Sequence, residues 1–156
     1  GRFTAVGGSD CHYHKIDHPA KLAQPTTFIF CGDAAPSPAA LLAGIRAGHA
    51  FVTEGPDGPE LYLSAEGAMM GDTIRPRADR VEFTMRARNA QGKTLQIVTM
   101  QGVAEQLLVA DVEWQRTIEV KVERTPYVRA VLTSGDMADP QVHSVTNPIY
   151  IEPASR

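Results

Sequence analysis

The chain has 156 residues, 43% of them hydrophobic, and a formal net charge of −3 at pH 7. A mildly acidic chain gives no electrostatic reason to expect nucleic acid or an anionic membrane as a partner. No apolar run approaches the roughly 20 residues of a membrane-spanning helix. The chain starts with Gly1 on what we interpret as an internal strand. We therefore expect an excised fragment, and we assign no cellular location.

The first expected elements are a short strand and a loop that contains metal-ligand residue types. Phe3–Val6 has the composition of a strand, and it leads through two glycines to Asp10 and His12. Glycines permit the unusual backbone angles and the close approach that a binding loop needs. A carboxylate and an imidazole suit Zn, Mn or Fe, and both can reach one ion if Cys11 turns away. The alternative is a polar loop with a hydrogen-bonded aspartate and a surface histidine.

Three further residues could take part in the chemistry of this loop. His14 extends the pattern and could bind substrate beside a metal, or it could lie in solvent. Cys11 could be a thiolate ligand, but neighbouring side chains in an extended loop point in opposite directions. Cys11 and Cys31 could form a disulfide, although two cysteines make no disulfide framework. We favour two reduced, partly buried thiols.

The next expected elements are a strand, a helix and a second strand. Thr26–Phe30 is β-branched and aromatic, which predicts a buried strand. Ser37 is a good N-cap, and Pro38 suits the first helical position. Gly48 suits the position after the last helical residue, so we expect the helix to end there. His49–Thr53 then has the pattern of a short strand.

A linker rich in Pro and Gly, residues 54–59, marks an expected boundary between units at 1–56 and 57–156. Beyond it, apolar and polar residues alternate with period two, most regularly in Val81–Arg88. About seven short strands without a helix predict a mainly β fold, an antiparallel immunoglobulin-like β-sandwich. The expected strands lie near residues 61–64, 81–88, 95–100, 106–110, 117–124, 127–133 and 142–151.

Three stretches together point to a known family. Gly7–His12 has a glycine, a serine, an aspartate and a histidine in a fixed order. Residues 37–56 contain a helix pattern ending in Arg-Ala-Gly and a strand pattern ending in Gly-Pro, and residues 146–151 read Thr-Asn-Pro-Ile-Tyr-Ile. These stretches resemble the PHP (polymerase and histidinol phosphatase) metallohydrolases, CehA/McbA-like branch. Two features depart from the pattern: Cys11 replaces a small residue, and Tyr13-His14 is not the common continuation.

The resemblance implies a distorted (β/α)₇ barrel that holds up to three divalent ions, with Asp10 and His12 as the last metal ligands. The other ligands of that family come from earlier barrel strands. Residues 1–56 would then be the C-terminal remnant of the barrel, and residues 57–156 an accessory sandwich. The implied activity is metal-assisted hydrolysis of a small-molecule phosphate ester, ester or carbamate. Without the other ligands, we expect the isolated chain to bind metal weakly and to be inactive.

Two other functions remain open. The sandwich could be a non-catalytic module that binds a ligand or partner, although its single tryptophan, Trp114, argues against a carbohydrate site. The chain could also be a secreted structural domain, which a Cys11–Cys31 disulfide would favour. For the hydrolase we expect an apolar patch facing the missing barrel, which could instead support an oligomer. Its expected members are Phe3, Val6, Phe28, Phe30, Leu41, Leu42 and Ile45.

Overall fold

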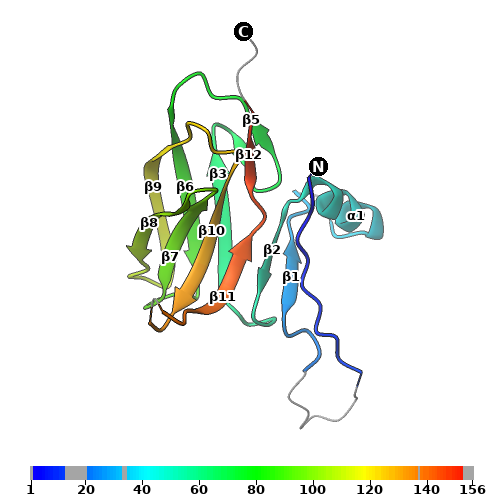
Figure 1. The fold of residues 1–156 in the computed structure, drawn as a ribbon. Coiled ribbons are helices and arrows are strands. Elements are labelled where there is room, and N and C mark those ends of the chain that lie inside the picture. The colour runs from blue at the N-terminus through cyan, green and yellow to red at the C-terminus, as the bar shows by residue number, and fades with distance from the viewer. Residues whose placement is uncertain (1, 13–20, 33–34, 137, 153–156) are drawn as a thin grey trace.

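A computed structural model of the chain describes residues 2–12, 21–32, 35–136 and 138–152 (Figure 1). The predicted mainly β, antiparallel architecture is confirmed, and two sheets face each other as in a β-sandwich. In chain order the elements are β1 (Thr26–Ile29), α1 (Pro38–Ala47), β2 (Ala50–Thr53), β3 (Glu60–Ala65), β4 (Ala68–Met69), β5 (Thr73–Ile74), β6 (Arg80–Arg88), β7 (Thr94–Thr99), β8 (Gly102–Leu108), β9 (Glu113–Lys121), β10 (Tyr127–Ser134), β11 (Gln141–Thr146) and β12 (Ile149–Ile151).

The larger sheet has the order β1-β2-β11-β10-β12-β5, and β7 joins it by pairing with both β10 and β8. The smaller sheet has the order β4-β3-β6-β9. Among the described strands, the β12–β5 pair is parallel and the other pairs are antiparallel. The expected last strand is divided by Asn147–Pro148 into β11 and β12, as a proline at a strand interruption predicts.

The core between the sheets follows from the period-two patterns. Along β6, every second side chain is buried while its neighbours face outward. Strands β3, β7 and β10 contribute their own apolar faces to the same cluster. Its largest side chains, nearly inaccessible to solvent, include Leu61, Phe83, Met85, Leu95, Ile97 and Leu132. Burial of this apolar surface is the main favourable term in the stability of the fold.

Helix α1 forms as its end signals predict. The Ser37 side chain accepts a hydrogen bond from the Ala40 N–H at 3.1 Å, and Pro38 occupies the first turn. Gly48 ends the helix in the left-handed conformation, with φ of 76°. The helix lies close against β1. A Cβ added to the buried Gly44 would fall 2.5 Å from the Ile29 side chain, so only glycine allows this approach.

The N-terminal strands are continuous with the sandwich. β1 pairs with β2, and β2 pairs with β11 across Thr53–Ser144, Val52–Val145 and Phe51–Thr146. Phe28 stacks on Phe51 with ring centroids 5.0 Å apart, and Phe51 contacts Tyr62 of β3 edge-on at 5.2 Å. The linker at residues 54–59 therefore joins β2 and β3, two strands that pack against each other.

Three local predictions were wrong. Residues 3–6 do not form a strand; the segment is held mainly by hydrogen bonds that involve side chains. β8 begins at Gly102, four residues before the strand expected near residues 106–110, because β8 pairs with β7 from Thr99 onward. The two-residue strands β4 and β5 lie between the expected strands 61–64 and 81–88, where no strand was expected. β4 pairs with the adjacent β3, whereas β5 pairs with β12, which lies far along the chain and leaves no local signal.

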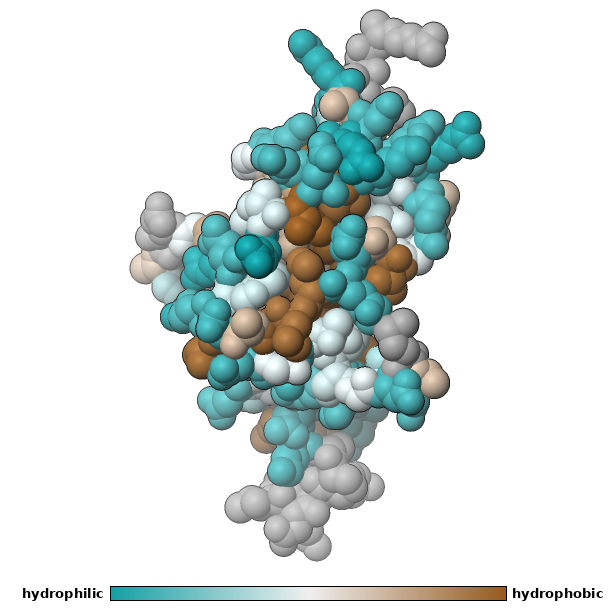
Figure 2. Space-filling view, turned by 90° about the vertical axis from the view of Figure 1, so that its left-hand side faces the viewer, coloured by the Kyte–Doolittle hydropathy of each residue, from teal (hydrophilic) through white to brown (hydrophobic). Residues whose placement is uncertain are grey.

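The two sheets are open along one edge of the sandwich. Strands β8 and β9 each end the pairing order of their sheet among the described residues. Figure 2 views the molecule from this side and shows an apolar strip between hydrophilic flanks. Exposed large hydrophobic residues on and beside these strands include Met100, Val103, Leu108 and Val112.

Candidate functional site

The segment before β1 places Asp10 and His12 by running alongside β1 (Figure 1). Its main anchor is Asn147, which is almost fully buried between β11 and β12. The Asn147 side chain accepts from the Ala5 N–H at 2.7 Å and donates to the carbonyl oxygens of Ala5 at 3.1 Å and Ala50 at 2.9 Å. One buried amide therefore joins the segment to β2 and to the sandwich, 142 residues away in sequence.

A second anchor lies at Gly7, the first glycine of the loop. The Gly7 N–H donates to the Thr27 hydroxyl at 2.8 Å, and that hydroxyl lies 3.0 Å from the Gly7 carbonyl oxygen. A Cβ on Gly7 would lie 2.5 Å from Val52 Cγ1, so a larger residue would push the segment off β2. Glycine is thus required here for close approach rather than for an unusual backbone angle.

The loop presents the Asp10 carboxylate and the His12 imidazole side by side. His12 Nε2 lies 3.0 Å from Asp10 Oδ1, and the two side chains are 77% and 92% exposed, respectively. Asp10 has φ of 48°, a left-handed conformation that is uncommon outside glycine. Asp10 and His12 are separated by one residue, Cys11. The backbone turn at Asp10 lets the two side chains point towards the same place.

This separation fits two ligands of a single ion. Two donor atoms of a tetrahedral Zn site, each about 2.1 Å from the metal, lie about 3.4 Å apart. The observed 3.0 Å is a hydrogen-bond distance, so the two side chains would have to separate slightly to bind one ion. Among the described residues, however, no group of three or more His, Cys, Asp or Glu side chains is placed to hold a metal ion. Asp10 and His12 can therefore supply part of a coordination shell but not all of it.

The remaining predicted residues of the loop are placed as follows. His14 lies outside the described residues. No disulfide joins Cys11 to Cys31, as we favoured, and the Cys31 thiol lies 3.8 Å from the Ile29 carbonyl oxygen. Thiolate ligation by Cys11 stays a prediction. The expected apolar patch is largely exposed in this chain: Phe3, Val6, Phe30, Leu41 and Leu42 are exposed, and Phe28 and Ile45 are partly buried.

A second histidine–carboxylate pair joins α1 to the sandwich. His49 Nε2 lies 2.8 Å from Asp72 Oδ1, and Asp72 Oδ2 accepts the Met69 N–H at 2.9 Å. Partial burial alone would raise the pKa of Asp72, but the hydrogen bonds from His49 and Met69 outweigh it and lower that pKa below its usual value. The His49 side chain thus contacts a residue 23 positions later in the sequence.

Comparison with known proteins gives no family assignment. No protein-family model matches the chain, and no match is found among curated proteins or solved structures. Within the described part of the chain, no helix is long and apolar enough to cross a membrane.

Proposed function

We propose that this chain is the C-terminal part of a PHP-type metal-dependent hydrolase, in which Asp10 and His12 are the last metal ligands. The observation that carries the proposal is the exposed pair of donor atoms, Asp10 Oδ1 and His12 Nε2, 3.0 Å apart on a loop that the rest of the fold anchors. The other ligands would come from a barrel segment upstream. The sandwich would then be an accessory domain.

The way in which the loop is held supports this function. A metal ligand must be positioned before the ion arrives, because affinity depends on preorganised coordination. Asn147 and Gly7 fix the backbone on the N-terminal side of the loop, while both donor side chains remain outside the core.

The exposed apolar patch also supports the proposal. Leu41 and Leu42 lie on α1, and Phe3 and Val6 lie on the segment that leads to the metal-ligand loop, with the Thr4 hydroxyl bonded to the Ile45 carbonyl oxygen of α1. Large exposed apolar patches usually mark contact surfaces. In the proposed hydrolase, the barrel would cover this patch and bring its ligands to the loop.

The chemistry of this site would be metal-assisted hydrolysis of a small-molecule phosphate ester, ester or carbamate. A bound Zn, Mn or Fe ion lowers the pKa of water towards neutrality and stabilises negative charge on the reacting oxygens. Asp10 would contribute a hard oxygen donor and one negative charge, and His12 a neutral imidazole nitrogen. For this metal-assisted reaction, no general acid or base is assigned within the chain.

The test uses the longer polypeptide that the proposal requires. Asp10→Ala and His12→Ala should each abolish hydrolysis of phosphate monoesters and lower the bound metal measured by mass spectrometry. Thermal unfolding should stay unchanged, because both side chains are exposed. Asp57→Ala, which removes another exposed loop aspartate, is the matched control and should keep full activity. Full activity after both ligand substitutions would show that the assignment is wrong.

A second function, partner binding through the sandwich, has one observation in its favour. The apolar strip between β8 and β9 (Figure 2) borders unpaired strand edges, which can accept an added strand. If the sandwich alone is the functional unit, changes at Asp10 and His12 should leave function intact. Val103→Glu, on the exposed edge, should then abolish it.

A further inference from the structure

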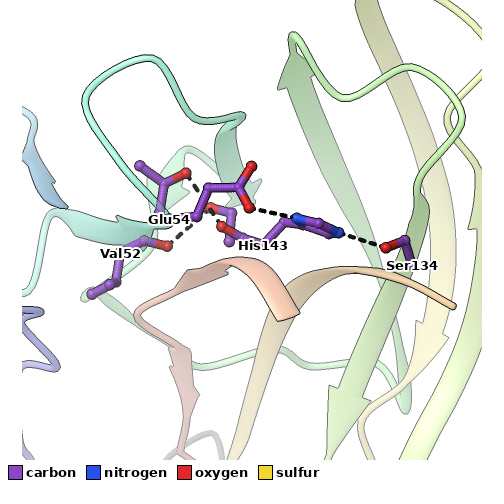
Figure 3. Close-up of polar contacts among 6 residues, drawn as sticks. Val52, Glu54, Ser134 and His143 are labelled. Atoms are coloured by element: carbon purple, nitrogen blue, oxygen red, sulfur yellow. Dashed lines mark hydrogen bonds and ion pairs between the residues drawn. The ribbon is translucent and has the colours of Figure 1, made fainter. Parts of the chain in front are cut away.

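Three residues from separate parts of the chain form a hydrogen-bonded line at the end of the sandwich (Figure 3). His143 Nδ1 lies 2.7 Å from Glu54 Oε2, and His143 Nε2 lies 2.6 Å from Ser134 Oγ. Glu54 directly follows β2, His143 is on β11, and Ser134 ends β10. No sequence pattern indicated this group, because Glu54 and His143 are 89 residues apart.

The partners of His143 determine which nitrogen carries the proton in the neutral ring. An ionised carboxylate can only accept hydrogen bonds, so Nδ1 must donate to Glu54. Nε2 then has a free lone pair, and it accepts the hydrogen bond from the Ser134 hydroxyl. This is the arrangement in which an imidazole acts as a general base on a serine while a carboxylate orients it.

The supporting contacts hold the line in place. The His143 side chain is only 8% exposed, so water has little access to the imidazole. The backbone around it is fixed, because the Glu54 N–H donates to the His143 carbonyl oxygen at 3.0 Å and the Thr53 hydroxyl donates to the same oxygen at 3.3 Å. The neighbouring Ser144 hydroxyl donates to the Val52 carbonyl oxygen at 3.0 Å.

The two ends of the line are reachable from solvent. Ser134 is partly exposed, and the Glu54 side chain is 43% exposed. Gly135 follows Ser134 with φ of 86°, so the strand turns sharply immediately after the hydroxyl. A partly exposed serine bonded to a buried imidazole is an arrangement that nucleophilic catalysis can use.

We propose that Ser134, His143 and Glu54 form a nucleophilic serine site that takes up an acyl or phosphonyl group from a small activated electrophile. Ser134 would be the nucleophile and His143 the general base. Glu54 would stabilise the positive charge that forms on the ring. The site uses neither Asp10 nor His12, so it is independent of the proposed metal chemistry.

The chemical step balances without any further reactant. With a fluorophosphonate, the Ser134 Oγ–P bond forms as the P–F bond breaks, and fluoride leaves with the bonding electrons. The hydroxyl proton passes to His143 Nε2, and it is released to solvent when the ring returns to its neutral form. With an ester, the same proton goes to the departing alkoxide, which leaves as an alcohol.

The test is to label the full chain with a fluorophosphonate probe and to map the adduct by mass spectrometry. One adduct per chain is expected, located on Ser134 and absent in Ser134→Ala. Ser64→Ala is the matched control, because Ser64 is also partly exposed but bonds to the Thr84 carbonyl oxygen instead of an imidazole. Ser64→Ala should label at the wild-type rate.

Two variants examine the role of the imidazole and the carboxylate. His143→Gln should slow labelling about 100-fold or more, which is the usual contribution of a general base. Because His143 is buried and its loss could unfold the chain, Glu54→Gln provides the second measurement. Glu54 is partly exposed, and its change to Gln should slow labelling about tenfold or more in a chain that keeps its thermal unfolding temperature. Absence of a Ser134 adduct, or an unchanged rate in Glu54→Gln, would overturn the proposal.

Discussion

The sandwich core and the N-terminal segment are stabilised in different ways. The core is a continuous apolar cluster from β3, β6, β7, β9, β10 and β12, and it contains side chains with no solvent exposure. The segment at residues 2–12 buries little apolar surface and leaves Phe3 and Val6 exposed. It is held by hydrogen bonds that Asn147 and Thr27 make with its backbone.

The comparison shows that the candidate metal-ligand loop is ordered by a few specific contacts rather than by general burial. A hydrogen bond contributes about 1 kcal/mol net, whereas a buried large apolar side chain contributes more. Changes in the core should therefore affect the whole fold. Changes at the anchors should release the loop and leave the sandwich folded.

The largest effect is expected in the core. Phe83→Ala should lower the free energy of unfolding by about 3–5 kcal/mol, because a fully buried ring is replaced by a cavity. Urea denaturation measures this change. Phe3→Ala removes a ring that is 84% exposed, so its effect should stay within about 0.5 kcal/mol. Equal losses in the two variants would mean that the N-terminal segment is packed as tightly as the core.

The next effect is expected at the main anchor. Asn147→Ala leaves the Ala5 N–H without its partner and removes two further hydrogen bonds, so stability should fall by about 2–3 kcal/mol. Hydrogen exchange should accelerate most at Ala5 and over the rest of residues 2–12. Gln141→Ala, which removes an exposed amide, should change neither quantity. Unchanged exchange at Ala5 in Asn147→Ala would rule out the anchor.

A smaller effect is expected where α1 meets the turn between β4 and β5. A Cβ on Gly71 would lie 2.2 Å from the Ala47 carbonyl oxygen, so Gly71→Ala should move the helix end away. Gly92→Ala is the control, because Gly92 also has a positive φ but has open space around it. Gly71→Ala should cost about 1–3 kcal/mol more than Gly92→Ala in thermal unfolding. Equal costs would show that backbone strain alone explains the loss.

The smallest effect is expected from the His49–Asp72 pair. The folded-state pKa of Asp72 is lowered, so its contribution to stability is present above the unfolded-state pKa and is lost as pH falls through the folded one. The wild-type unfolding temperature should therefore fall more steeply below about pH 4 than that of Asp72→Asn. Parallel pH profiles for the two proteins would mean that Asp72 makes no net contribution through its charge.

Much of the fold could be predicted from local patterns. The strict alternation in residues 81–88 determines which face of β6 is buried, and Ser37 and Gly48 determine where α1 begins and ends. These signals are local because strand and helix periodicity place side chains on one face independently of the partner. The boundary near residue 56 rested on composition alone, and composition does not reveal that β2 pairs with β11.

The candidate sites were harder to predict from the sequence than the fold. Asp10 and His12 could be selected because metal ligands two residues apart form a recognisable local pattern. Asn147 could be noticed only as part of Thr-Asn-Pro, and its role as an anchor depends on Ala5 and Ala50 being nearby in space. The line from Glu54 through His143 to Ser134 had no local signal, since three separate strand ends bring these residues together.

Asp10 and His12 are proposed to be two ligands of an incomplete metal site. The most direct test is a titration of this chain with Mn²⁺, followed by paramagnetic broadening of backbone amide signals. Broadening should begin at residues 8–12, show weak affinity, and disappear in the Asp10→Ala/His12→Ala double variant but not in Asp57→Ala. Broadening that begins elsewhere, or that persists in the double variant, would contradict the account.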